Sequence, residues 1–461
     1  MTEKTDILVI GATGYTGAYI VRYLVAHPQR SRFTLALGAR STEKLQKLAD
    51  DLKLSKDVKL VKLDVTKQED IDAAVATTRV VINAVGPYWT WGTPVVRSCV
   101  QHGVHYVDIT GERSWIKRII NEFDYLATKT GAIIVPSCGF DSVPSDISAY
   151  LANKTLKALG PDASGEYLSI ADCTSAVVVK GGVSGGTIAS AITAMEQVPR
   201  RFSRESMRPY SLSPFQGIRR PSFRSVYSLF VPGEKPIRGG LWFMAASNRG
   251  IVERTFGLFQ TQGKPKDAYG PNFCYDEFQV TRGVVSAFFL TASLVFGFSM
   301  MLIKPIRSLV KRYLPQSGDG PTDEQMQKGF FKITNLATST SSPPVQVKTV
   351  LKGQGDPGYL LTPSAHSLYD FLCVMAELTR TLRATVMITE SALCLLLPLA
   401  SERKTRTQTD YIQALPEFAH KGGILTPMTA FGDALIQRLE ESGRFEFSST
   451  VVGDASARKN I

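Results

Sequence analysis

The sequence predicts an α/β protein in which an N-terminal doubly wound parallel sheet is followed by a second, mixed α/β domain. From residue 6 to about 150, strand-length apolar runs alternate with helical stretches, and parallel strands need such crossover connections. The chain has 461 residues, too many for one ordinary domain. Hydrophobic residues make up 44% and charged residues 20%, which excludes a disordered or fibrous chain.

The elements of the first domain follow in order along the chain. Strands are expected at 6–10, 33–39, 58–64, 80–86, 105–110 and 132–139. Helices are expected at 16–26, 41–52, 93–102 and 116–131. Short apolar strands separated by helices favour a parallel sheet with helices on both faces. We expect this domain to span residues 1–150.

Beyond residue 150 the pattern is less regular. Strand patterns occur at 166–179, 330–338 and 344–353, and helical patterns at 181–198, 364–382 and 384–397. The proline-containing basic segment that continues to about 240 is expected to be irregular. The predicted division is therefore 1–150, then 151–282 for the first part of the second domain, 283–314 for an apolar and basic segment, and 320–461 for the remainder and the tail.

A glycine-rich turn, VIGATGYTGAYI, joins the first strand to the first helix. Glycine lets the main chain adopt a positive φ and approach a ligand closely, and the free N–H groups of a helix N-terminus attract a diphosphate. Glycine turns also serve packing alone, but a turn between a first strand and a helix is the context of a Rossmann-type dinucleotide site. The expected contacts come from Gly11, Thr13, Gly14, Tyr15, Thr16 and Gly17.

The end of the second strand indicates which dinucleotide binds. NAD sites usually carry an acid there for the ribose hydroxyl, whereas this chain has Arg40 and Ser41, with Lys44 one turn later. A guanidinium group can pair with a 2′-phosphate, so the pattern favours NADP(H); the alternative is that Arg40 is an ordinary surface residue. Further cofactor contacts are expected after the third and fourth strands, from Asp64, Asn83 and Gly86.

Half of the net charge of +12 lies between residues 200 and 224, where the chain has seven arginines and one acid, Glu205. Such a segment suits lipid headgroups or a phosphorylated substrate carrier, and the alternative is a solvated loop; we expect no nucleic-acid partner. The six cysteines form no CxxC pair and no metal-ligand spacing, so we expect reduced thiols and no metal site. The N-terminus lacks signal-peptide architecture, which predicts an intracellular, cytosol-facing protein.

An apolar run of twenty-one residues without a charge extends from Gly283 to Ile303, and the basic residues Lys304, Arg307, Lys311 and Arg312 follow it. The run is long enough to span a bilayer, but a span would separate the two parts of the second domain. A helix embedded in one leaflet keeps those parts together, and a buried core helix is the remaining alternative. We expect residues 284–314 and 200–224 to contact a membrane or a lipid-droplet surface.

Several longer motifs resemble one family. The segments NAVGPYWTWGTPVVRSCVQHGVHYVDITGE, VPSCGFDSVPSD and GGILTPMTAFGDALIQRLEESGRFEF are together similar to saccharopine dehydrogenase-like oxidoreductases, a family that includes the mycobacterial trans-acting enoyl reductases. The resemblance implies an NADP-binding domain, a mixed α/β domain and a cleft between them. It also implies an apolar segment near 284–303 and, for animal members, association with lipid droplets. True saccharopine reductases lack a membrane-length stretch, which argues against lysine metabolism.

Candidate catalytic groups lie at the expected cleft. Hydride transfer needs a group that orients or protonates the acceptor, and we assign that role to Asp141; the alternative is that Asp141 caps the next helix. Tyr88 is expected to stack on the acceptor or donate a hydrogen bond to it, and the alternative is an aromatic residue packed under the loop. The other polar groups expected there are Asp108, Glu112, Ser137, Ser142 and Asp146.

These features lead to one functional hypothesis and two alternatives. We expect an NADPH-dependent oxidoreductase that acts on a lipidic acceptor, and an acyl chain bound to a carrier is one such acceptor. The resemblance implies that the reaction is enoyl reduction in (glyco)lipid biosynthesis. The first alternative is a non-catalytic NADP(H)-binding scaffold at lipid surfaces. The second is a saccharopine-type amino-acid reductase. A homodimer is left open.

Overall fold

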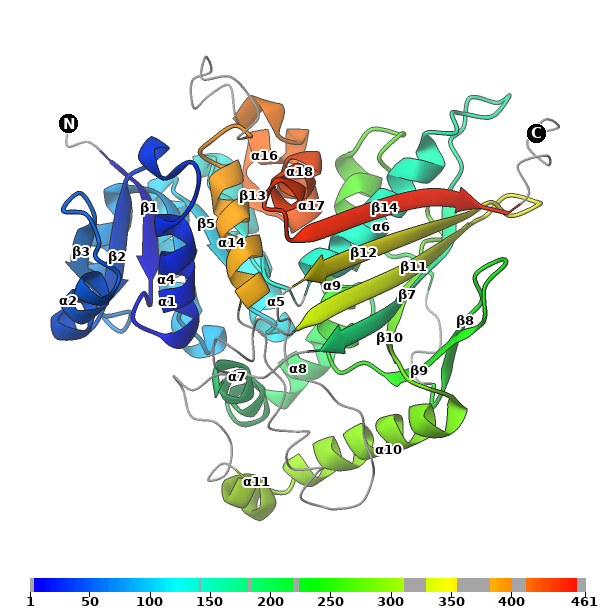
Figure 1. Ribbon diagram of the computed structural model, residues 1–461, viewed down its shortest axis with the longest axis horizontal. Helices are drawn as coiled ribbons and strands as arrows, with labels where there is room; N and C mark the ends of the chain where they lie inside the picture. The colour runs from blue at the N-terminus through cyan, green and yellow to red at the C-terminus, as the bar shows by residue number, and fades with distance from the viewer. Residues whose placement is uncertain are drawn as a thin grey trace.

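The computed structural model describes residues 4–140, 142–180, 185–218, 224–310, 329–354, 382–399 and 412–453. Its described strands form two seven-stranded sheets. The first sheet and its helices stand on one side of the molecule and the second sheet on the other (Figure 1). The predicted helix at 364–382 lies outside the described residues except for its last position.

The first sheet is a doubly wound parallel sheet, as the sequence predicts. Its strand order is β13-β6-β5-β4-β1-β2-β3, and the order reverses beside the first strand, where dinucleotides bind in such folds. Residues 7–10 of β1 are fully buried because helices cover both faces of the sheet. The strands are β1 (Thr5–Ile10), β2 (Leu35–Ala39), β3 (Lys59–Lys62), β4 (Thr78–Asn83), β5 (His105–Asp108), β6 (Ile133–Val135) and β13 (Gly423–Ile424).

Helices alternate with these strands. Both long helices of this group end at a glycine in the left-handed region, Gly103 and Gly131, which is a common helix stop. The fourth helix begins at Tyr88 rather than at the predicted residue 93. The helices are α1 (Tyr15–Val25), α2 (Thr42–Asp51), α3 (Gln68–Ala76), α4 (Tyr88–His102) and α5 (Arg113–Thr130).

The C-terminal part of the chain returns to the first sheet. Strand β13 pairs with β6, and helix α14 (Leu382–Cys394) packs against α1, β4 and β5. Figure 1 shows α14 between the first sheet and the C-terminal helices. The division at residue 150 stays a prediction, and residues 382–394 and 423–424 add distant segments to the first domain.

The second sheet is mixed, with strand order β14-β12-β11-β7-β10-β9-β8. Strands β7 and β10 pair in parallel and their other described neighbours are antiparallel. Helices α6 (Val143–Lys157) and α9 (Ala245–Gln262) pack against this sheet and against each other. The strands are β7 (Ile170–Lys180), β8 (Tyr227–Leu229), β9 (Ile237–Leu241), β10 (Tyr275–Val280), β11 (Phe330–Ser339), β12 (Gln346–Gln354) and β14 (Phe445–Val452).

The prediction that residues 200–240 are irregular is wrong in part. It contains helix α8 (Arg200–Ser206), strand β8 and the start of β9. Strand β8 is only three residues long and pairs with the next strand, β9, so its pattern is too short to detect in the sequence. The remaining helices are α7 (Gly185–Glu196), α10 (Val284–Met301), α11 (Lys304–Val310), α16 (Glu417–Lys421), α17 (Pro427–Ala430) and α18 (Asp433–Glu441).

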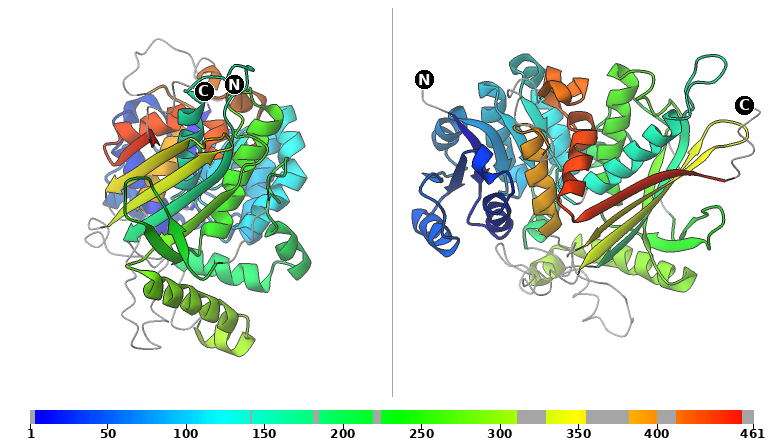
Figure 2. Two further views of the ribbon diagram at one scale, coloured as in Figure 1. Left: turned by 90° about the vertical axis from the view of Figure 1, so that its right-hand side faces the viewer. Right: turned by 45° about the horizontal axis from the view of Figure 1, so that its top comes forward.

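Helix α10 lies along β9 at the edge of the second sheet. The Thr291 hydroxyl accepts the Leu241 N–H at 2.9 Å and donates to the Ser225 carbonyl oxygen at 2.9 Å. A Cβ atom on Gly240 would lie 2.5 Å from the Ala287 carbonyl oxygen, so only glycine leaves room for this approach. Both views in Figure 2 show α10 on the outside of the body.

Candidate active site

The glycine turn after β1 has the geometry of a diphosphate site. Gly11 has a φ of +83°, and a Cβ atom on Gly17 would lie 2.0 Å from the Gly11 carbonyl oxygen. Both positions therefore require glycine. Gly14 is the N-cap residue of α1, and the first helical turn holds no acid that would compete with an anion. The first-turn N–H groups, which have no acceptor within the helix, suit a diphosphate.

The end of β2 carries a cation and no acid. Arg40 is exposed after the strand, next to Ser41, which is the N-cap residue of α2. The Ser41 hydroxyl accepts the Lys44 N–H at 3.2 Å and donates to Glu43 at 2.7 Å. Arg40 and the side chain of Lys44 therefore fit the 2′-phosphate of NADP(H) better than the hydroxyl of NAD.

Asp64 lies close enough to Arg40 for the positive charge of Arg40 to lower its pKa. Its carboxylate accepts the Thr66 N–H at 3.0 Å and the Thr66 hydroxyl at 2.8 Å. These hydrogen bonds, and then the positive charge of Arg40, hold the pKa of Asp64 below its ordinary value. The carboxylate thus helps to order the loop after β3.

The wall after β4 is built around Tyr88. Its hydroxyl donates to the Asn83 carbonyl oxygen at 2.9 Å, and its ring centroid lies 5.3 Å from that of Trp115. The side chain is 5% exposed, and burial raises the pKa of its hydroxyl well above the ordinary value. Asn83 is also buried and accepts the Val85 N–H at 3.0 Å. This geometry favours the packed-aromatic interpretation of Tyr88.

Glu112, in the loop after β5, stabilises the same wall although it is 24 residues from Tyr88 in the sequence. Its two carboxylate oxygens accept the N–H groups of Tyr88 at 2.7 Å and Trp89 at 2.8 Å, and the Ser190 hydroxyl donates to it at 2.7 Å. Glu112 therefore caps α4 and connects it to α7. Burial raises the pKa of Glu112, although the three hydrogen bonds oppose that shift. The sequence placed Glu112 near the cleft but gave no sign of these partners.

Two other acids of the predicted cluster are fully buried. Asp108 accepts hydrogen bonds from the Tyr106 hydroxyl and from the main-chain N–H groups of Thr110 and Ser137, each at 2.9 Å. Asp146 accepts the Thr255 hydroxyl at 2.6 Å. Burial raises the pKa of each carboxyl to about 7.

Of the other predicted cleft residues, Ser142 is described by the structure and Asp141 is not. Ser142 is buried, and its hydroxyl contacts the Asn248 side chain at 3.4 Å. Asp141 lies outside the described residues, so its assignment as the catalytic group stays a prediction. Among the described residues, no group of three His, Cys, Asp or Glu side chains could hold a metal ion.

The glycine turn and the wall after β4 open into one cleft of about 1920 Å³. The opposite side of the cleft is formed by residues of α7, α8, α10 and α11. Gly17, Ser41, Asp64 and Asn83 are not among its lining residues. The predicted site residues that line it are Gly11, Thr13, Gly14, Tyr15, Thr16, Arg40, Lys44, Gly86 and Tyr88.

The parallel sheet carries a diphosphate-binding turn at its switch point, and a cation and a large cleft adjoin that turn. These features define a dinucleotide-dependent oxidoreductase. Residues 7–163 match the saccharopine dehydrogenase NADP binding domain. A Mycobacterium tuberculosis protein with trans-acting enoyl reductase in its name is 31% identical over 464 residues, which cover 96% of each chain. The chain belongs to the saccharopine dehydrogenase-like oxidoreductase family, and its cofactor is NADP(H).

Two more distant similarities complete this picture. The lipid droplet localized protein of Caenorhabditis elegans is 36% identical over 157 residues, 33% of this chain and 37% of that protein. The apo saccharopine dehydrogenase (L-Glu forming) of Saccharomyces cerevisiae has a TM-score of 0.50 at 12% identity, over 97% of this chain and 100% of that chain. The second similarity concerns the fold alone.

Proposed function

We propose that the chain uses NADPH to reduce a carbon–carbon double bond conjugated to a carbonyl group in a lipidic acyl substrate, at a membrane or lipid-droplet surface. The observation that carries this proposal is the continuity of the cleft. The same cavity is lined by Gly86 and Tyr88 on the proposed nicotinamide side, and by Phe298 of the apolar helix α10 and Leu302 directly after it. The name of the mycobacterial relative supports the reaction.

Helix α10 supports the membrane part of the proposal. The buried residues of α10, from Ala287 to Met301, recur at helical spacing on the side that faces the body, whereas Val285, Phe289 and Phe296 on the other side are 70%, 53% and 54% exposed. A helix that is apolar all round is normally covered on every side, so a lipid phase is the natural cover for the exposed side. Because the helix is docked along its whole length, we propose that it lies in one leaflet and does not span.

In this reaction bound NADPH supplies a hydride, which reaches the β-carbon of the unsaturated acyl group, and a proton then reaches the α-carbon. The chain contributes binding and orientation. With the cofactor bound, Arg40 and Lys44 would hold the 2′-phosphate, the α1 N-terminus would hold the diphosphate, and the wall at Gly86 would contact the nicotinamide. We retain Asp141 as the proposed source of the proton.

One test uses the purified full chain with NADPH and trans-2-hexadecenoyl-CoA in detergent micelles. Consumption of NADPH together with a saturated product, identified by mass spectrometry, would support the proposal. The matched control is Gly17→Ala, because a Cβ atom there would lie 2.0 Å from the Gly11 carbonyl oxygen and close the diphosphate site. NADPH binding without turnover of any unsaturated lipid would support the scaffold instead. Turnover with aminoadipate semialdehyde and glutamate would support the amino-acid reductase.

The scaffold has one observation in its favour. Glu112 is the carboxylate that lines the cleft beside the nicotinamide wall, and it already accepts three hydrogen bonds. Both carboxylate oxygens hold main-chain N–H groups at the start of α4, so Glu112 is committed to positioning that helix rather than to contacting a substrate. If Asp141→Asn leaves turnover unchanged, the proton must come from solvent or from the substrate side.

A further inference from the structure

The end of the cleft that α7, α8, α10 and α11 form carries an unusual concentration of positive charge. Arg200 and Arg204 of α8 and Lys304 at the start of α11 all line the cavity. Each of these three side chains belongs to an exposed residue. Figure 1 shows α7, α8, α10 and α11 grouped below the two sheets. We call Arg200, Arg204 and Lys304 the cationic rim.

The cationic rim has no carboxylate partner within the part of the chain that the structure describes. Neighbouring cations do have one: Arg201 pairs with Glu205 at 3.2 Å on the outer side of α8, and Arg307 pairs with Glu196 of α7 at 3.0 Å. Among the described residues that line the cavity, the acids are Glu112 and Glu196, and both are already hydrogen-bonded. Three cations without a carboxylate partner at the edge of one cavity favour an anionic ligand.

The elements that carry the rim are held in place. The Ser206 hydroxyl of α8 contacts the Ser114 hydroxyl of α5 at 2.8 Å. Arg307 of α11 is 7% exposed and, besides its bond to Glu196, donates to the Met301 carbonyl oxygen at 2.8 Å. The rim is therefore presented by fixed helices, which reduces the entropy lost on binding.

Apolar side chains adjoin the rim within the same cavity. Met195 of α7, Met207 after α8, Phe298 of α10 and Leu302, which directly follows α10, line it, and Leu302 is 69% exposed. Flexible methionine side chains accommodate chains of different shape. The cavity therefore combines a site for an anion with a path for a hydrocarbon chain that leads to the lipid-facing helix.

We propose that this end of the cleft is a subsite for a phosphate ester attached to a long acyl chain. The cationic rim binds the phosphate group, and the chain passes along Met195, Met207 and Phe298 towards the wall at Tyr88. Both a phospholipid and a phosphate-bearing acyl thioester offer this chemistry. The orientation of the chain rests on the proposed function, whereas binding of the phosphate does not.

Phosphate binding at the subsite is tested first. The probe is hexadecyl phosphate, and the control ligand is hexadecanol, which has the same chain length and no charge. Saturating NADPH fills the cofactor site so that the probe cannot bind there, and fluorescence of Trp89 and Trp91, which line the cleft, reports occupancy. In the triple variant Arg200→Gln, Arg204→Gln, Lys304→Gln we expect hexadecyl phosphate to bind about tenfold or more weakly, because three charge-assisted contacts are lost. Hexadecanol should bind equally to both proteins.

The matched control is Arg201→Gln, which removes a cation from the same helix but not from the cavity. Unchanged NADPH affinity shows that each variant is folded. If the triple variant binds hexadecyl phosphate as tightly as the unchanged chain, or if Arg201→Gln weakens it equally, the subsite proposal is wrong.

Turnover then distinguishes the source of the phosphate. Three substrates share one unsaturated sixteen-carbon chain: the CoA thioester, the N-acetylcysteamine thioester without phosphate, and a lysophosphatidic acid. The triple variant should raise KM for the preferred phosphate-bearing substrate with little change in kcat, and should leave the phosphate-free thioester unaffected. An equal rise in KM for all three would overturn the subsite. No turnover with any of them contradicts the proposed function, and the binding result still decides the subsite.

Discussion

Two apolar helices of this chain have opposite environments. Helix α14 contains a carboxylate, Glu390, and is buried at every described side chain from Thr385 to Cys394. Helix α10 contains no charged residue and is buried on one side only. Apolar composition alone therefore does not decide whether a helix enters the core. The difference lies in the partners that tertiary structure supplies to each helix.

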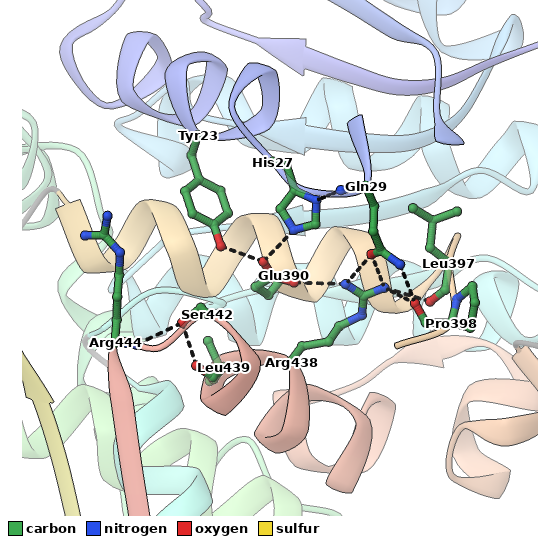
Figure 3. Close-up of polar contacts among 10 residues, drawn as sticks. All are labelled: Tyr23, His27, Gln29, Glu390, Leu397, Pro398, Arg438, Leu439, Ser442 and Arg444. Carbon is green, nitrogen blue, oxygen red and sulfur yellow. Dashed lines mark hydrogen bonds and ion pairs between the residues drawn. The ribbon is translucent and has the colours of Figure 1, made fainter. Parts of the chain in front are cut away.

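Glu390 is tolerated in the core because a polar network satisfies it (Figure 3). Its carboxylate accepts hydrogen bonds from the Tyr23 hydroxyl at 2.7 Å, from His27 Nε2 at 3.0 Å and from Arg438 at 3.0 Å. The Gln29 N–H donates to His27 Nδ1 at 3.1 Å, so the proton of the neutral imidazole lies on Nε2. Burial raises the pKa of Glu390, but His27 and Arg438 reverse that effect and hold it below the ordinary value.

This network joins three parts of the molecule that are distant in the sequence. Tyr23 belongs to α1, Glu390 to α14 and Arg438 to α18. Arg438 is 3% exposed and also donates to the Leu397 and Pro398 carbonyl oxygens. Polar groups thus fix α14 between the first domain and the C-terminal helices, whereas α10 is left with an apolar outer surface.

The largest expected effect is on the α14 network. Arg438→Met should lower the free energy of unfolding by about 3–5 kcal/mol, because it leaves the Glu390 carboxylate buried without its cation. Chemical denaturation of the full chain with bound NADPH measures this. A loss below about 1 kcal/mol would show that the ion pair does not hold α14.

The two sides of α10 should respond differently to a charge. Leu294→Asp, at a position 2% exposed, should destabilise the protein by at least about 3 kcal/mol, since it buries an unpaired carboxylate. Phe289→Asp with Phe296→Asp should change stability by less than about 1 kcal/mol.

The same double variant should weaken flotation with phosphatidylcholine vesicles by at least about tenfold, because each phenylalanine contributes about 1.5–3 kcal/mol when buried in lipid. If instead the unchanged chain is a dimer that the double variant converts to a monomer, with no effect on vesicle binding, a second copy covers α10.

The pH dependence of the two helices should also differ. Since the folded-state pKa of Glu390 is depressed, its charge contributes stability that is present above its ordinary value of 4.5 and is lost as the pH falls through the folded-state pKa. The stability advantage of the unchanged chain over Glu390→Gln should therefore shrink below about pH 4.5. Binding to uncharged vesicles should stay constant, because residues 284–303 contain no ionisable side chain.

The smallest effect on stability is expected at an exposed ion pair between α6 and the first residue of α18. Lys154 and Asp433 lie 2.6 Å apart with side chains 55% and 47% exposed. Lys154→Met should cost about 0–1 kcal/mol, because solvent screens such pairs. A cost as large as that of Arg438→Met would mean that burial is not what distinguishes the two ion pairs.

Local patterns made the first domain predictable. The strand and helix signals between residues 5 and 135 are short-range, and the glycine turn occurs where the structure has the β1–α1 connection. The partners of Glu112 could not be predicted, because Tyr88 and Ser190 lie 24 and 78 residues away from it. Strand β13 has two residues and exists only because β6 offers it an edge.

The sequence by itself determined the dinucleotide turn, the cation at the end of β2, and the presence of a membrane-length apolar helix, because each depends on residues within one turn or one element. Tertiary structure alone decided that α10 docks by one side, that α14 is buried together with its acid, and that the cationic rim meets the apolar helix in one cleft. Those outcomes depend on which distant backbone and side-chain groups pair. An element that is apolar on every side carries no local signal of the side that the rest of the chain will cover.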